Sequence, residues 1–153
     1  MDSNKITRLF TGLRTDMQFR TNYNTILFDL FLEEPFTVAF DEGADAYTNF
    51  TVLANTDGSF PPKPVFILFI VPKRKWFSAA RKDTEDMLRK LLGEAETPIE
   101  TIHGAIVCGT RITFYHYDRQ EGVFSPESPD VDLTKEDGAV RMLEVVGDVR
   151  DMC

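Results

Sequence analysis

The sequence predicts an α/β domain in which a mixed β-sheet of about five strands is flanked by helices. The run 64–72 (PVFILFIVP) carries no polar side chain, which is typical of a central strand buried on both faces. Two pairs of shorter strands are separated by turn residues, as in hairpins. A helical segment after the central strand is long enough for a crossover between parallel strands. Together these segments give the order α-β-β-β-α-β-β-α.

The chain before the central strand predicts one helix and one hairpin. Residues 1–13 are expected to form a loose N-terminal arm. A helix follows over about 15–33, because apolar residues recur at three-and-four spacing and Pro35 ends the pattern. Residues 36–40 alternate apolar and polar side chains, as a half-exposed strand does, and residues 49–54 supply its hairpin partner.

The chain after the central strand predicts two helices around a second hairpin. Ser78 is expected to cap a helix over about 79–92, which stops at Gly93. Strands 104–108 and 111–117 are separated only by Gly109-Thr110, which favours a tight turn. Residues 119–133 are expected to form an exposed loop. Thr134 is expected to cap a C-terminal helix within residues 134–151.

Length and composition indicate one soluble domain, residues 1–153, inside a cell. The apolar fraction of 42% and the charged fraction of 27% are those of a globular protein. No apolar run approaches the roughly 20 residues of a membrane helix, so no membrane association is expected. The N-terminus does not match a signal peptide, and two cysteines do not make a disulfide framework. We therefore expect a reduced, cytoplasmic or nuclear protein.

The net charge of −8 is distributed unevenly. Residues 29–57 contain no Lys or Arg, and their acids are Asp29, Glu33, Glu34, Asp41, Glu42, Asp45 and Asp57. The bases instead concentrate in residues 73–90. Overall acidity argues against nucleic-acid binding that ignores sequence, because such binding depends on neutralising phosphates. A local basic face is still compatible with this composition.

Three segments resemble the PD-(D/E)XK nuclease-like superfamily, whose fold is that of restriction endonucleases. They are TNFTVLAN (48–55), PVFILFIVPK (64–73) and IHGAIVCGTRITFYHYD (102–118), and the resemblance covers about residues 20–118. The resemblance implies a metal-binding Asp at the start of the second hairpin strand and a Glu-x-Lys element on the buried third strand. It therefore implies a restriction-endonuclease-like fold and, in an active member, cleavage of nucleic acid with a divalent metal.

This chain departs from the family's pattern at the residues that carry the chemistry. Asn49 stands at the position of the metal-binding Asp, and Phe69 and Val71 stand at those of the acid and the Lys. The chemistry needs carboxylates to hold Mg²⁺ and a Lys near the attacking water. The resemblance therefore implies a catalytically inactive relative, for which no catalytic residue, metal or cofactor is expected.

The strongest candidate binding site is a basic segment that follows the central strand. Aromatic side chains among bases can stack on nucleobases or contact an acidic partner. The competing interpretation is that the aromatic residues pack beneath the following helix and the bases keep the strand end soluble. The candidate binding residues are Lys73, Arg74, Lys75, Trp76, Arg81 and Lys82.

Other candidates have a structural interpretation that is favoured. Asp41 with its acidic neighbours fits a solvated turn better than a cation site. His116 and Asp118 share a strand face and could form a dyad or half of a metal site, but a surface strand histidine is the favoured interpretation. Cys108 lies in an apolar strand, as a buried and inert thiol does.

The favoured functional hypothesis is a non-catalytic protein-interaction module on a nuclease-like scaffold. One alternative is a metal-dependent nuclease whose active-site residues have migrated to Glu34, Asp41 and Lys73. The other is a nucleic-acid-binding protein that uses the 73–82 basic segment. A homodimer is also predicted from apolar residues in the arm (Leu9, Phe10, Leu13) and from the stripe Val140–Val149 of the last helix.

Overall fold

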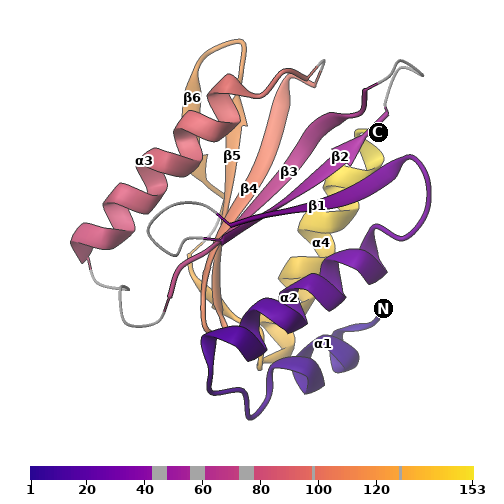
Figure 1. The fold of residues 1–153 in the computed structure, drawn as a ribbon, viewed down its shortest axis with the longest axis vertical. Coiled ribbons are helices and arrows are strands. Elements are labelled where there is room, and N and C mark those ends of the chain that lie inside the picture. Colours follow the sequence, from indigo (N-terminus) through magenta and orange to yellow (C-terminus); the bar gives the residue numbers. More distant parts are fainter. Residues whose placement is uncertain (43–47, 56–60, 73–77, 98, 128) are drawn as a thin grey trace.

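A computed structural model describes residues 1–42, 48–55, 61–72, 78–97, 99–127 and 129–153. Within these residues the chain is α/β, with one mixed, open sheet and four helices (Figure 1). The elements are α1 (Ser3–Phe10), α2 (Asp16–Leu30), β1 (Phe36–Glu42), β2 (Thr48–Ala54), β3 (Lys63–Ile70), α3 (Ser78–Glu94), β4 (Thr101–Cys108), β5 (Arg111–Asp118), β6 (Val123–Pro126), β7 (Val131–Asp132) and α4 (Glu136–Asp151).

The sheet follows the order β1-β2-β3-β4-β5-β6, and the short β7 pairs with β5 beside β6. Only β3 and β4 are parallel, and α3 connects them; the other neighbours are antiparallel. The predicted mixed sheet and crossover helix are therefore confirmed. The sheet has seven strands, however, where about five were expected.

The central strand is β3, and it is buried on both faces as its sequence predicts. Phe66 and Leu68 pack into the larger core, which α1, α2 and α4 cover on one side of the sheet. Ile67 and Phe69 pack into the smaller core beneath α3 on the other side (Figure 1). Alternate residues of one strand thus contribute to two separate cores, because successive side chains point to opposite faces.

The predicted tight turn joins β4 to β5. Cys108 pairs with Arg111, which leaves Gly109 and Thr110 as the two turn residues. Gly109 has a φ of 61°, a left-handed value that this kind of turn requires. The buried hydroxyl of Tyr23 donates a 2.9 Å hydrogen bond to the Gly109 carbonyl, so α2 is tied to this turn. Burial raises the pKa of Tyr23 well above its ordinary value, which keeps that donor protonated.

The expected loose arm is instead the helix α1, so that prediction is wrong. The Asp2 side chain caps the helix by accepting a 2.8 Å hydrogen bond from the backbone N–H of Lys5. Ile6 and Phe10 are four residues apart, so they lie on one face, and both are fully buried. The ring centroids of Phe10 and Tyr23 are 4.6 Å apart. An isolated helix of eight residues is unstable in water, and tertiary packing is what stabilises α1.

The expected exposed loop over 119–133 is also wrong, because it contributes β6 and β7 to the sheet. Leu133, at its end, is fully buried. Thr134 does not cap α4, since its hydroxyl and backbone N–H both donate to Asp132. The N-cap residue is Lys135, which makes no capping bond through its side chain. A Cβ on Gly138 would lie 2.0 Å from the Asp132 carbonyl oxygen, so only glycine allows this approach of α4 to β7.

The apolar residues offered for a homodimer form part of the chain's own core. Phe10, Val146 and Val149 are all buried in the larger core, where α1 lies beside α4. Val140 is partly exposed. The buried residues of this set are therefore not available for a dimer interface. Within the described residues, no helix combines the length and the apolar character that crossing a membrane requires.

We predict that Phe10→Ala lowers the free energy of unfolding by about 3–5 kcal/mol, since it removes a large ring from a closed core. Urea denaturation measures this change. Met17→Ala is the control, because Met17 is 65% exposed and its truncation should cost less than about 0.5 kcal/mol. Equal effects of the two substitutions would mean that α1 is not part of the core.

Candidate functional site

The positions that the family resemblance implies do come together in the structure. Asn49 on β2 lies directly opposite Phe69 on β3, on the sheet face that α3 covers. Phe69 is 3% exposed, and Val71, on the same face, is buried too. Asp41 on β1 lies opposite Asn49 on its other side. This row across three strands therefore holds one carboxylate, one amide and one buried aromatic ring.

The carboxylates proposed for a migrated active site do not converge. Glu34 precedes β1 and Asp41 lies near its far end, so the two are roughly 20 Å apart at 3.3 Å per strand residue. Lys73 lies outside the described residues. Among the residues that the structure describes, no group of three or more His, Cys, Asp or Glu side chains is arranged to hold a metal ion.

The basic segment is described only in part. Lys73, Arg74, Lys75 and Trp76 lie outside the described residues. Lys82 is exposed on α3. Arg81 forms a two-pronged ion pair with Asp130, with N···O distances of 2.8 and 2.6 Å.

The Arg81–Asp130 pair fastens the start of α3 to the end of the sheet. Arg81 also donates a 3.1 Å hydrogen bond to the Thr113 hydroxyl on β5, and that hydroxyl contacts Asp130. Hydrogen bonds from Arg81 lower the pKa of Asp130, so the carboxylate is ionised near neutral pH. The charge of Arg81 is therefore matched within the chain, which weakens its case as a ligand for phosphate.

A cavity of about 440 Å³ lies beside this ion pair. Its lining includes Glu85 from α3 and Tyr115 from β5. The Tyr115 ring stacks on Phe124 with their centroids 5.0 Å apart. Burial raises the pKa of Tyr115 to about 12, so the phenol stays protonated and is a donor rather than a base.

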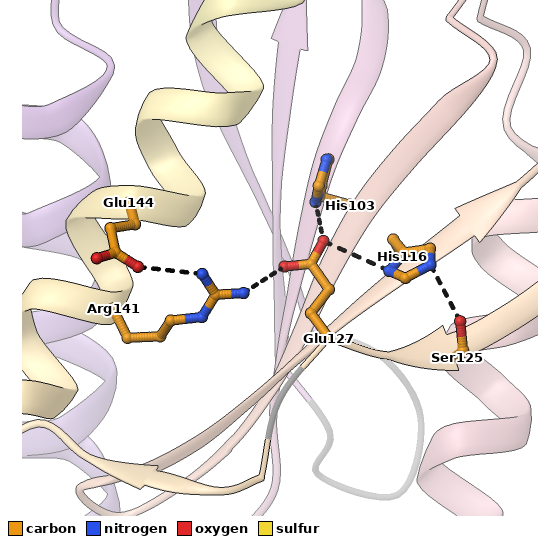
Figure 2. A network of polar contacts seen from close by, with 6 residues as sticks. All are labelled: His103, His116, Ser125, Glu127, Arg141 and Glu144. Atoms are coloured by element: carbon orange, nitrogen blue, oxygen red, sulfur yellow. Dashed lines mark hydrogen bonds and ion pairs between the residues drawn. The ribbon is translucent and has the colours of Figure 1, made fainter.

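A second polar cluster lies on the opposite face of the sheet, beneath α4 (Figure 2). His103, His116 and Ser125 form one row across β4, β5 and β6, because His116 pairs with each of the other two. Glu127 follows β6, and its backbone N–H donates a 2.9 Å hydrogen bond to the Phe114 carbonyl. This bond places the Glu127 side chain among the histidines.

Glu127 is the centre of the cluster. One carboxylate oxygen lies 2.6 Å from Nδ1 of His103 and 3.6 Å from Nδ1 of His116. The other oxygen accepts a 3.2 Å hydrogen bond from Arg141 on α4. A second nitrogen of Arg141 donates a 3.2 Å hydrogen bond to Glu144 (Figure 2). The Glu127 side chain is only 10% exposed, so these contacts replace most of its hydration.

The pKa of Glu127 reflects two opposing effects. Burial raises the pKa, whereas the contacts with His103, His116 and Arg141 lower it, and the contacts prevail. The lowered pKa means that the folded state favours the ionised carboxylate. That carboxylate joins β4, β5 and the end of β6 to α4.

In space, Ser125, His116 and Glu127 follow one another as a nucleophile, a base and an orienting acid would. Ser125 Oγ lies 3.0 Å from Nε2 of His116. In a catalytic triad the acid makes its hydrogen bond to the base. Here the 3.6 Å distance to His116 is too long for one, and the close contacts of Glu127 are with His103 and Arg141. We therefore interpret the cluster as structural.

Sequence reasoning missed this cluster because it treated residues 119–133 as a loop. The β-branched and aromatic pair Val123-Phe124, bounded by Gly122 and Pro126, was the available sign of a strand there. Asp118 does not pair with His116 as a dyad: its carboxylate accepts from the backbone N–H groups of Gln120 and Glu121. Cys108, expected to be buried, is only partly so.

Comparison of the chain with protein-family models, with curated proteins and with solved structures finds no match.

We predict that Glu127→Gln lowers the free energy of unfolding at pH 7 by about 2–4 kcal/mol, because the partly buried Arg141 would then face a neutral amide. The lowered pKa makes the carboxylate stabilising above its ordinary pKa of 4.5, and this contribution is lost as pH falls through the folded-state value. The difference between wild type and variant should thus shrink near pH 3. Urea denaturation at both pH values measures it.

Glu144→Gln is the matched control, since Glu144 pairs with the same Arg141 but is 58% exposed. Its effect should stay below about 1 kcal/mol. A difference between wild type and Glu127→Gln that does not change with pH would contradict the assigned role of Glu127.

We predict that Arg81→Ala lowers the free energy of unfolding by about 1.5–3 kcal/mol, because it leaves the half-buried Asp130 without its charged partner. Lys82→Ala, one residue later and exposed, should change stability by less than about 0.5 kcal/mol. Thermal or urea unfolding compares the two. If neither Arg81→Ala nor Lys82→Ala changed the free energy of unfolding, the Arg81–Asp130 pair would not be what holds α3 against the sheet.

Proposed function

We propose that the chain is a non-catalytic protein-interaction module built on a nuclease-like scaffold. The scaffold is supported by the order of elements: α2 precedes the antiparallel strands β1-β2-β3, and α3 leads to the parallel β4 and then β5. This is the order that the resemblance to the PD-(D/E)XK superfamily implies.

The proposed lack of catalytic activity is supported by the pairing of Asn49 with Phe69 across β2 and β3. The positions expected to hold two metal ligands are adjacent, but they present an amide and a buried ring. A divalent metal such as Mg²⁺ is held through carboxylates, substrate phosphates and water. The apolar Val71 supplies no charge near the site. Together these residues favour binding over hydrolysis.

A protein partner is favoured over nucleic acid by the charge of the chain. The net charge is −8, and Arg81 is matched by Asp130. Nucleic-acid binding depends on cations that neutralise phosphates. An acidic chain meets less electrostatic opposition from a neutral or basic protein surface.

One observation favours the alternative of a metal-dependent nuclease. Asp41 is exposed and lies directly beside Asn49, so one carboxylate does reach the row of expected ligands. A single carboxylate binds Mg²⁺ or Mn²⁺ weakly without phosphate ligands. The alternative therefore makes a clear demand on Asp41.

We predict that the wild-type protein neither binds Mn²⁺ at millimolar concentration nor cleaves DNA or RNA in its presence. Asn49→Asp should create measurable Mn²⁺ binding, because directly opposed strand residues have Cβ atoms about 5 Å apart and Asp41 is the neighbour. Isothermal titration calorimetry and a nuclease assay test both statements. Metal-dependent cleavage by wild type that Asp41→Ala abolishes would overturn the proposed function.

A further inference from the structure

Helix α2 holds two large apolar side chains outside the stripe that faces the core. Its inner stripe is buried and includes Phe19, Tyr23 and Ile26. Met17 and Phe28 lie on another side of the helix, 65% and 48% exposed. Exposing a large apolar side chain to water is unfavourable, and a surface where several such side chains gather is commonly an interaction surface.

Phe28 lines a groove between α2 and the strand β1, whose other α2 residues are Arg20, Thr21 and Asn24. The groove has a volume of about 480 Å³, and its apolar lining is Phe28 from α2, Val38 and Phe40 from β1, and Phe50 from β2. Phe40 is 49% exposed, although its ring lies 5.2 Å from the buried ring of Phe50. The guanidinium of Arg20 lies over Phe40, 5.7 Å from the ring centre.

Strand β1 is also an edge of the sheet. It pairs with β2 on one side, and no described strand lies on its other side. Alternate N–H and C=O groups of an edge strand point outward and can pair with an added strand. A peptide added to β1 would place every second side chain on the face where the groove lies.

The charges around β1 decide between a second copy of this chain and a different partner. Glu33 and Glu34 precede the strand, Asp41 lies near its end, and all three are exposed. A second copy paired with β1 in antiparallel fashion would bring the acids of one end against those of the other. Parallel pairing would bring like ends together. Both arrangements oppose like charges, so self-pairing is disfavoured and basic ends on the partner are favoured.

We infer that the edge of β1 and the adjoining groove bind an extended peptide of a basic protein partner. The peptide adds a strand to β1, inserts apolar side chains at alternate positions, and carries Lys or Arg at its ends. The inference deepens the proposed interaction module and depends on it, because it names where the partner binds and of what chemistry it is.

A random 12-residue peptide library displayed on phage tests the inference. Selection uses the wild-type protein, with counter-selection on the double variant Phe28→Ser, Phe40→Ser, whose sites are half-exposed and whose fold is checked by circular dichroism. The expected result is enrichment of peptides with alternating apolar residues and terminal bases. A synthetic peptide of the enriched sequence should bind about tenfold more weakly to Phe28→Ala or Phe40→Ala.

Two further measurements separate strand addition from other modes of binding. Hydrogen exchange should slow at β1 amides when the peptide binds, and N-methylation of alternate peptide amides should abolish binding, because both report on the added ladder. Val123→Ser is the control: Val123 is 48% exposed on β6, at the opposite edge of the sheet, and the substitution should leave affinity unchanged.

Each outcome has a distinct meaning. If no peptide is enriched on the wild type over the double variant, the groove is overturned and the interaction module is left standing. Enriched peptides that are acidic, or that lack alternating apolar residues, would overturn the inferred partner chemistry. Metal-dependent nuclease activity would overturn the proposed function itself, independently of the peptide result.

Discussion

The burial of β3 on both faces is the constraint on which the rest of this fold depends. A strand with apolar side chains on both sides is stable only if each face of the sheet is covered. Helix α3 covers one face and also makes the crossover to the parallel β4. The other face needs a larger cover, and α1, α2 and α4 supply it together. The short α1 is helical because the helix places Ile6 and Phe10 on one face, where both are buried in this core.

The segment that follows β6 is held in place by ion pairs as well as by apolar packing. Glu127 reaches His103 and Arg141 on the face covered by α4, whereas Asp130 reaches Arg81 on the face covered by α3. Two carboxylates only three residues apart therefore bind partners on opposite sides of the sheet. Burying a charge is unfavourable unless it is paired, so each pair depends on the correct placement of the other elements. The two pairs fix the sheet's β5–β6 end to both helical layers.

The sequence predicts the elements whose information is local. The apolar run of β3, the helical stripe of α2 and the two-residue turn at Gly109-Thr110 each specify their structure within a few residues. The helix α1 and the strands β6 and β7 are too short for such a pattern to be decisive, and they form because distant residues pack against them. Glu127 could not be recognised as a buried charge from its neighbours in sequence. Its partners His103 and Arg141 lie 24 and 14 residues away along the chain, and only the fold brings them together.

The two edges of the sheet differ in what they offer a partner. Near β6, the polar side chains of Glu127, Ser125 and His116 already make contacts within the chain, so their capacity for interaction is largely used. Near β1, the rings of Phe28 and Phe40 are half-exposed to water and line an open groove. Hydration of such rings is unfavourable, and covering them would release that cost. The titratable cluster therefore stabilises this fold, whereas the apolar groove at the opposite edge is the part of the molecule that gains by binding.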